Sequence, residues 1–174
     1  MSPIVRIIAA AVLATAACGA SAQQATLIPL LERLAEANNA EALYHLGMAY
    51  QTGSDVAADH TKALATFRKA AELGDPLASY MLGCYYDGEG EGLVADDPSL
   101  ALKYKLVAAE AGYALAQQDV GILYAQSGDI PTGLAWLEKA VVQGWSGGLM
   151  TLASVYNGAP GIEPDAGKTA AYFR

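Results

Sequence analysis

The sequence predicts an all-α protein built from repeated pairs of helices, and three observations support this fold class. Alanine, the strongest helix former, supplies 36 of the 174 residues. Apolar residues recur at the i, i+3, i+4 and i+7 spacing of an amphipathic helix in successive segments. A motif that contains Ala, Leu, Gly and Tyr returns about every 36 residues, a period typical of stacked helical hairpins.

The charge balance and the apolar content exclude several other classes of protein. The chain has 10 Lys and Arg residues against 18 Asp and Glu residues, a formal net charge of −8. This balance, with no basic cluster, excludes a typical nucleic-acid-binding surface. An apolar content of 53% is too high for a disordered chain. No second apolar run approaches about 18 residues, so we expect no transmembrane segment.

The first 22 residues are predicted to be a cleaved signal peptide. Arg6 provides the short positive region, and residues 7–17 form an apolar stretch too short to span the ~30 Å core of a bilayer. Ala20 and Ala22 supply the small residues that signal peptidase requires. Cleavage after Ala22 removes the one positive charge of Arg6 and changes the net charge from −8 to −9. We therefore expect an exported protein, either periplasmic or secreted.

An alternative for the same segment is a lipid anchor. The run TAAC at residues 15–18 resembles the lipoprotein cleavage motif, with Thr15 in place of its usual Leu. In that case an acylated Cys18 ties the chain to a membrane surface. With cleavage after Ala22, Cys84 is the single remaining cysteine, and no intramolecular disulfide is possible.

The first helix of each predicted pair carries a motif that ends in tyrosine. Its copies lie at residues 42–50, 78–86, 120–124 and 152–156, with Tyr50, Tyr86, Tyr124 and Tyr156 at the same position. Gly47 and Gly83 lie inside the first two copies and cost about 1 kcal/mol each relative to alanine. We expect these glycines because a helix without a Cβ there lets its neighbour approach closely.

The second helix of each pair is predicted to end at a glycine. Its copies lie at residues 62–74, 100–112 and 133–144. Glycine favours the left-handed conformation that terminates a helix, and Asn38 replaces it in a matching segment at residues 34–38. Asp75 and Pro76 then provide an N-cap and a proline at the first position of the next helix.

These motifs divide the chain into a leader, a half-repeat and four repeats. The predicted ranges are 1–22 for the signal peptide, 23–39 for an N-terminal half-repeat helix, 40–76 for repeat 1, 77–113 for repeat 2, 114–145 for repeat 3 and 146–174 for an incomplete repeat 4. By analogy with Arg68, Arg174 lies partway along its helix. We therefore expect either that the chain is a fragment of a longer one or that it ends abruptly.

The pattern A-x-x-x-L-G-x-x-Y, a Gly-rich loop, D-x-x-K-A and a helix ending K-A-A-E-x-G resembles the Sel-1-like repeat, a branch of the tetratricopeptide-like α/α solenoids. The resemblance covers residues 27–174. It implies a right-handed superhelix of antiparallel helix pairs and, for an exported bacterial member, a scaffold or adaptor in the cell envelope. The chain departs from the pattern at Ala153 and in repeat 3, which lacks D-x-x-K. The aromatic pair that the family usually has in the second helix is complete only at Tyr172-Phe173; the other repeats have Thr66-Phe67, Tyr104-Lys105 and Trp136-Leu137.

The resemblance also implies where a partner binds. In solenoids of this type the first helices line the concave face, and residues there that do not pack between repeats are candidate contacts. We expect a protein or peptide partner, and the acidic balance favours one with a basic surface. For each apolar candidate, packing between repeats is the alternative. The candidates are Tyr44, Met48, Gln51, Tyr80, Cys84, Asp87, Gln118, Ile122, Gln126, Met150, Ser154 and Asn157.

Three patterns suggest chemistry, but each has a plainer interpretation. Residues 144–148 match G-x-S-x-G, yet a helix and not a strand is predicted before them, and no His follows residue 60. The acidic residues at 87–97 offer carboxylates for Ca²⁺ without EF-hand spacing. Cys84 with His45 as its base lacks an orienting third group. We expect no enzyme activity, metal or cofactor; the alternative is a cell-envelope enzyme that uses Cys84 or the acidic loop at 87–97.

Overall fold

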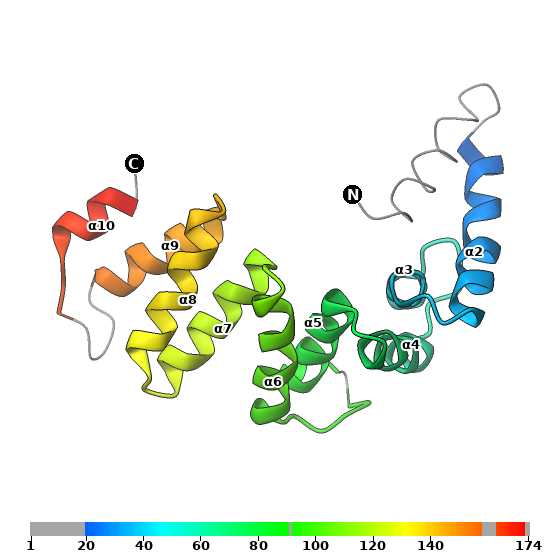
Figure 1. Cartoon of the computed structure of the whole chain (residues 1–174), viewed down its shortest axis with the longest axis horizontal. Helices are drawn as coiled ribbons and strands as arrows, with labels where there is room; N and C mark the ends of the chain where they lie inside the picture. The colour runs from blue at the N-terminus through cyan, green and yellow to red at the C-terminus, as the bar shows by residue number, and fades with distance from the viewer. Residues whose placement is uncertain (1–19, 91, 158–162, 173–174) are drawn as a thin grey trace. The chain divides into compact units, whose positions relative to one another are not determined.

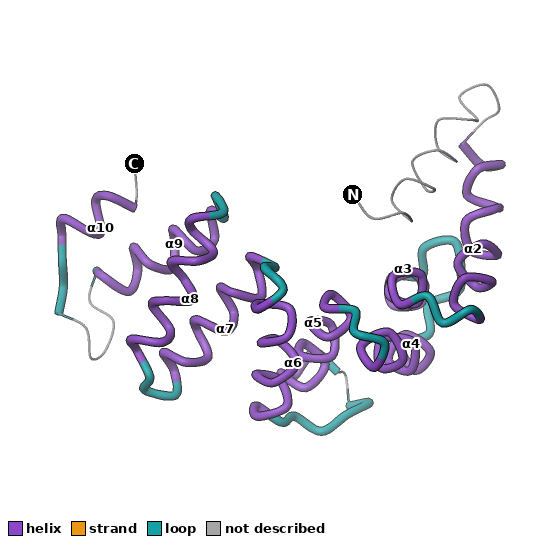
Figure 2. The backbone as a smooth tube through the Cα atoms, viewed as in Figure 1, coloured by secondary structure: helices purple, strands orange, loops and turns teal. Residues whose placement is uncertain are grey.

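The computed structural model describes residues 20–90, 92–157 and 163–172, and the regular secondary structure of this part of the chain is helical (Figure 1). The tube in Figure 2 shows the same helices in purple, with the described loops and turns in teal. The all-α class predicted from composition and periodicity is confirmed. In chain order the elements are α2 (Ala20–Glu36), α3 (Ala40–Thr52), α4 (His60–Glu72), α5 (Pro76–Cys84), η1 (Tyr85–Glu89), α6 (Pro98–Glu110), α7 (Ala114–Gln126), α8 (Ile130–Val142), α9 (Ser146–Tyr156) and α10 (Ala166–Tyr172).

The chain divides into two compact units, residues 1–82 and 83–174, and each is described by itself. In the first unit α2 packs against α3, and α3 packs against α4. In the second unit η1 packs against α6, and α6, α7, α8, α9 and α10 each pack against the next helix along the chain. Neighbours in sequence are therefore neighbours in space within each unit, as the helical-hairpin repeat predicts.

One backbone hydrogen bond recurs in all four repeats and closes the loop between their two helices. The N–H of the aspartate that precedes the second helix donates to the carbonyl oxygen of the tyrosine at the end of the first. The pairs are Asp59 with Tyr50 (2.8 Å), Asp97 with Tyr86 (2.9 Å), Asp129 with Tyr124 (3.0 Å) and Asp165 with Tyr156 (2.9 Å). The recurring tyrosines thus mark a fixed loop closure, although the number of residues between the two partners varies.

The same aspartates cap the second helices with their side chains. Oδ1 of Asp59 and of Asp165 accepts the N–H of the residue three positions later at 2.9 Å. Asp129 makes this contact at 3.3 Å, so repeat 3 keeps the cap although it lacks D-x-x-K. Where the pattern is complete, its lysine also lies over the tyrosine ring as a cation–π contact: Lys62 over Tyr50 (5.4 Å) and Lys168 over Tyr156 (4.5 Å).

The predicted ends of the helices are confirmed. The residues predicted to terminate helices have the left-handed conformation: Gly74 (φ +88°), Gly112 (φ +92°), Gly144 (φ +81°) and Asn38 (φ +56°). Glycine and, less readily, asparagine adopt this conformation at a small steric cost. Asp75 caps α5 as expected, because its Oδ1 accepts the N–H of Ala78 at 2.7 Å, and Pro76 begins that helix.

Glycines inside the first helices allow the second helices to pack closely. A Cβ added at Gly47 would lie 2.6 Å from Cε1 of Phe67, and one at Gly121 would lie 2.7 Å from Cγ of Leu137. These distances are inside van der Waals contact, so any side chain there would push the helices apart. The predicted reason for the glycines in the helix interior is confirmed.

The end of α5 differs from the ends of the other first helices. Its last turn widens into η1, a π-helical turn in which Asp87 (φ −95°) and Gly88 (φ +98°) leave the helical conformation. The conformation of Gly88 requires a glycine, because φ +98° is unfavourable for a residue with a Cβ. This turn carries the predicted contact Asp87 and begins the Gly-rich loop of repeat 2.

Several predictions concern residues outside the described part of the chain. Most of the predicted signal peptide, with Cys18, lies there; its last three residues, 20–22, form the start of α2. Glu91 of the acidic loop, Phe173 and Arg174 also lie outside the described residues. Among the helices that are described, none is both long enough and apolar enough to cross a membrane.

Candidate functional site

The predicted contact residues lie on α3, on α5 with η1, on α7, and on α9 with the residue after it. Most are at least partly exposed. Cys84 is different, because it is 5% exposed and packs in the core of its unit. The candidates are divided between the two units: the first holds Tyr44, Met48, Gln51 and Tyr80, all half-buried, and the second holds the half-buried Gln118 and Ile122 and the exposed Asp87, Gln126, Met150, Ser154 and Asn157.

In the first unit, α2 and α3 form an apolar groove that includes the predicted contact Met48. The groove has a volume of about 440 Å³. An apolar side chain fits it, and the exposed Asp55 supplies a carboxylate. Asp55 has φ +64°, an uncommon backbone conformation for a residue with a side chain. The residues that form the apolar walls include Leu27, Ile28 and Leu31 from α2 and Met48 and Ala49 from α3.

Tyr44, one turn before Met48, is held in place by its aromatic neighbours. Its ring centroid lies 5.2 Å from that of His45 in an edge-to-face arrangement. It lies 6.2 Å from that of Phe67, which is fully buried. These distances are typical of favourable aromatic pairs, so the half-buried ring is a fixed part of the surface of α3.

In the second unit, a buried lysine on α6 holds two aspartates. The side chain of Lys105 is 4% exposed, and its Nζ lies 2.5 Å from Oδ2 of Asp87 and 3.3 Å from Oδ2 of Asp119. Because Asp87 belongs to η1 and Asp119 to α7, the ammonium links three elements of this unit. The two carboxylates remain 35% and 23% exposed, so they also reach solvent. We call Asp87, Lys105 and Asp119 the lysine cluster.

The pKa values of Lys105 and of the neighbouring Tyr113 are both raised. Burial lowers the pKa of Lys105, but its hydrogen bond to Asp87 and the negative groups around it outweigh burial and raise the pKa above 10.5. Lys105 is therefore charged at neutral pH. Burial, together with the nearby Cys84 and Asp119, raises the pKa of Tyr113 above 10.0, so its phenol stays protonated.

Sequence reasoning did not select Lys105 or Asp119, although a signal for them was present. Lys105 takes the repeat position that Phe67 and Leu137 fill in repeats 1 and 3, packing on the glycine of the first helix. A Cβ at Gly83 would lie 2.5 Å from Cγ of Lys105. A charged residue at an otherwise apolar core position requires a partner of opposite charge, and an acidic residue on the next first helix is the natural candidate.

Polar side chains connect the helices on the other side of α7. Gln117 is 5% exposed; its Nε2 donates to the carbonyl of Ala109 at 3.0 Å, and its Oε1 accepts from Nε2 of Gln143 at 2.7 Å. Gln118, a predicted contact, accepts a hydrogen bond from Nε1 of Trp145. Its amide is therefore engaged within the chain, which ties α7 to the start of α9.

The structure shows where the residues of the three patterns that suggested chemistry lie. Residues 144–148 form a turn and the start of α9 after a helix, as predicted, and not the strand-to-helix turn of a nucleophile. His45 and Cys84 belong to different units. Within the residues that the structure describes, which omit Glu91, no group of three or more His, Cys, Asp or Glu side chains is arranged to hold a metal ion.

The repeat motif places the chain among known proteins. The family model of the Sel1 repeat matches it three times, at residues 40–75, 76–113 and 114–144. The chain belongs to the Sel1 repeat family. Sel1 repeats are typically protein–protein interaction scaffolds, and proteins built from them are generally non-enzymatic.

Solved structures of Sel1 repeat proteins share the fold. A protective antigen present in uropathogenic Escherichia coli strains, which displays an SLR fold, is 30% identical with a TM-score of 0.75, covering 84% of this chain and 32% of that one. A Sel1 repeat protein from Oxalobacter formigenes is 26% identical with a TM-score of 0.71, covering 82% and 60%. The predicted α/α solenoid class is thereby confirmed, and this Sel1 chain spans less than two thirds of either protein.

A curated relative shares a shorter segment. The ERAD-associated E3 ubiquitin-protein ligase component HRD3A of Arabidopsis thaliana is 41% identical over 58 residues, which is 33% of this Sel1 chain and 9% of that protein. The likeness therefore concerns a small part of that larger protein.

Proposed function

We propose that this Sel1 repeat protein is an exported, non-enzymatic scaffold that binds a protein partner with a basic surface in the bacterial cell envelope. The exposure pattern of the first helices carries the proposal. In α9, Leu152 and Ala153 are fully buried, whereas Met150 is 68% exposed and Ser154 is exposed. A helix that packs through one side and leaves adaptable residues on the other presents an interaction surface.

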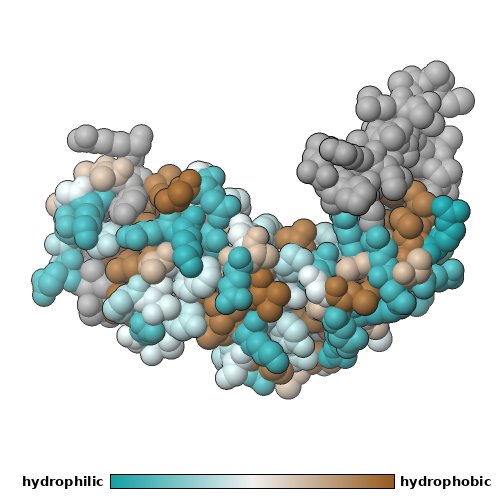
Figure 3. All heavy atoms as spheres, viewed as in Figure 1, coloured by the Kyte–Doolittle hydropathy of each residue, from teal (hydrophilic) through white to brown (hydrophobic). Residues whose placement is uncertain are grey.

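The charge distribution supports a basic partner. The net charge is −8. Asp55 lines the apolar groove together with the predicted contact Met48. Asp87 is itself a predicted contact, and Asp119 directly follows the predicted contact Gln118. Figure 3 shows hydrophilic side chains over much of the visible surface, with hydrophobic patches between them. Such a surface attracts cationic partners, and the attraction weakens as salt shortens the Debye length from about 10 Å at 0.1 M to about 3 Å at 1 M.

Site-specific cross-linking in the producing bacterium tests the binding surface. A photo-reactive amino acid at Gln126 or Ser154, on first helices of the second unit, is expected to capture the same partner from the cell envelope. The matched control positions are Glu110 and Glu138, which are exposed on second helices of the same unit. Equal capture from the control positions, or no capture from Gln126 and Ser154, contradicts the proposed surface.

Export has its own test. The positive residue, the short apolar stretch and the small residues before Gln23 support cleavage by signal peptidase. N-terminal sequencing of the protein recovered from the envelope is expected to begin at Gln23. An acylated Cys18 at the N-terminus identifies the lipid-anchored alternative, and an intact Met1 on cytoplasmic protein contradicts export.

A further inference from the structure

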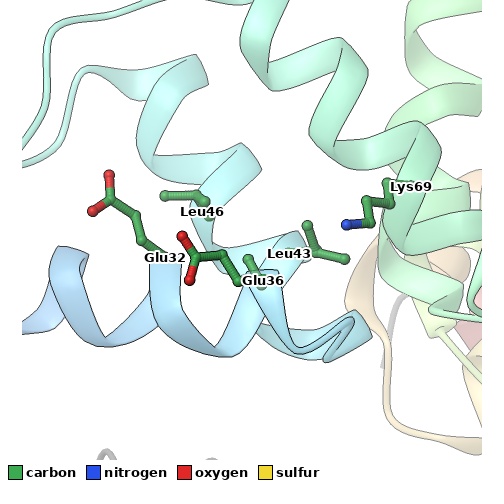
Figure 4. Close-up of a pocket in the computed structure, with 6 residues that line it drawn as sticks. Glu32, Glu36, Leu43, Leu46 and Lys69 are labelled. Atoms are coloured by element: carbon green, nitrogen blue, oxygen red, sulfur yellow. The ribbon is translucent and has the colours of Figure 1, made fainter.

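A second groove in the first unit has a different character from the one beside Met48. It has a volume of about 360 Å³ and is bounded by α2, α3 and α4. Its floor is apolar and well packed: Ala35, Leu43 and Leu46 are 7%, 4% and 7% exposed. Figure 4 shows Glu32 and Glu36 extending from α2, and Lys69 extending from α4 toward Leu43. We call this surface, formed by Glu32, Ala35, Glu36, Leu43, Leu46 and Lys69, the charged groove.

The charged side chains of the charged groove have no ionic partner among the described residues. Glu32, Glu36 and Lys69 are exposed, and none of them forms an ion pair with another described residue. Glu32 and Glu36 are one helical turn apart, a spacing at which like charges repel. The groove therefore holds two unneutralised carboxylates on the α2 side and one ammonium on the α4 side, over an apolar floor.

We propose that the charged groove docks a short peptide segment of the partner, with an arginine side chain against Glu32 and Glu36 and a carboxylate against Lys69. Arginine matches the α2 side because its aliphatic stem packs on apolar surface while its planar guanidinium donates to two carboxylates at once. A carboxylate matches the α4 side because it accepts charge-assisted hydrogen bonds from an ammonium. The arrangement of charges therefore also sets the direction in which the segment lies.

This inference rests on the proposed function only in taking a protein as the partner. Residues of an α-helix are separated by about 100° around its axis, so Leu43 and Leu46 lie on a different side of α3 from Tyr44 and Met48. Binding at the charged groove and binding at the predicted contacts therefore change the signals of different residues. A negative result for the charged groove therefore does not contradict binding at the predicted contacts, and the reverse also holds.

Peptide titration followed by NMR tests the charged groove directly. The probe is acetyl-Arg-Leu-Leu with a free carboxylate, in which three extended residues cover about 10 Å between the positive and the negative group. Two altered probes isolate the charges: citrulline in place of arginine removes the positive charge at nearly constant shape, and a C-terminal amide removes the negative charge. The amide signals of Glu32, Glu36, Leu43, Leu46 and Lys69 are the readout.

Each altered probe is expected to bind equally well to the wild-type protein and to the variant that lacks the complementary charge of the groove. The variant Glu32→Gln/Glu36→Gln is expected to weaken the binding of the arginine probe about tenfold and to leave the binding of the citrulline probe unchanged. Lys69→Gln is expected to weaken the free-carboxylate probe and to leave the amidated probe unchanged. The control variant Glu110→Gln/Glu138→Gln changes the net charge of the protein equally in the second unit and is expected to bind all probes normally.

Several outcomes overturn the inference. Equal affinity of the arginine and citrulline probes shows that the carboxylates do not select a cation. An equal loss in the control variant shows that only overall charge matters. Signal changes confined to Tyr44, Met48 and Gln51, or none with millimolar probe, show that the groove takes no such segment. Glutamine keeps the size and helix propensity of glutamate, and circular dichroism confirms that each variant is folded.

Discussion

Lys105 shows what a single residue of a repeat does to the core around it. Phe67 and Leu137, at the equivalent positions, fill the space over a glycine with apolar atoms. Lys105 fills this space with its aliphatic stem and has a positive charge at the end of its side chain. Removing a charge from water is costly, and Asp87 and Asp119 offset that cost. Because both aspartates are partly exposed, the cluster stabilises the unit far less than its short distances suggest.

Removing the aspartates is expected to reveal the cost of the buried charge. Asp87→Ala with Asp119→Ala leaves the ammonium of Lys105 buried without its carboxylates, and the free energy of unfolding is expected to fall by about 3 kcal/mol. Adding Lys105→Met is expected to restore much of this loss, because methionine keeps the stem and removes the charge. Urea denaturation of the two variants measures the difference. A triple variant as unstable as the double variant contradicts the expectation.

The lysine cluster is also expected to make the second unit sensitive to alkaline pH. The pKa of Lys105 is raised above 10.5 in the folded protein, so its contribution is fully present below 10.5 and is lost as pH rises through the folded value. Tyr113 acts in the same direction, because its pKa is raised above 10.0 and the unfolded chain loses this proton first. Unfolding free energies measured between pH 9 and pH 12 are expected to fall, and less steeply for Lys105→Met. Equal slopes for the two proteins contradict the role of Lys105.

At the scale of the helix, local rules predicted most of what the structure shows. Gly74 and Asn38 end helices, and Asp75 and Pro76 begin one, because caps depend on a few consecutive residues. The grooves beside α2 and the lysine cluster depend on which side chains meet across helices. The repeat position of Lys105 marks it as a charge in the core, but which carboxylates reach it is known only from the packing of α6 on η1 and α7.

A helix-interior glycine is expected to control the spacing of its helix pair. Gly47→Ala places a Cβ against the ring of Phe67, and the free energy of unfolding is expected to fall by about 2 kcal/mol despite the better helix propensity of alanine. Phe67→Leu in the same chain is expected to recover part of the loss, because a smaller side chain leaves room for the added methyl group. Thermal unfolding of the single and double variants checks this. A stabilising Gly47→Ala contradicts close packing at this position.

At the scale of the whole molecule, the chain is a series of similar units in which contacts are local. Helices pack against their neighbours along the chain, and two compact units, residues 1–82 and 83–174, result. In a repeat protein the stability is approximately a sum of contributions from each repeat and from its contacts with the next. A change in one unit therefore acts first on the helices of that unit.

This locality is expected to appear in hydrogen exchange. Gly47→Ala and Gly121→Ala change the same repeat position in different units, and each adds a Cβ against the second helix of its own pair. Amides of α3 and α4 are expected to exchange faster in the first variant, and those of α7 and α8 in the second, because sub-global opening follows local contacts. Each variant thus serves as the control for the other. If either change accelerates exchange equally in all four helices, the chain opens as one cooperative unit, and the partner-binding surfaces of the two units cannot be weakened independently.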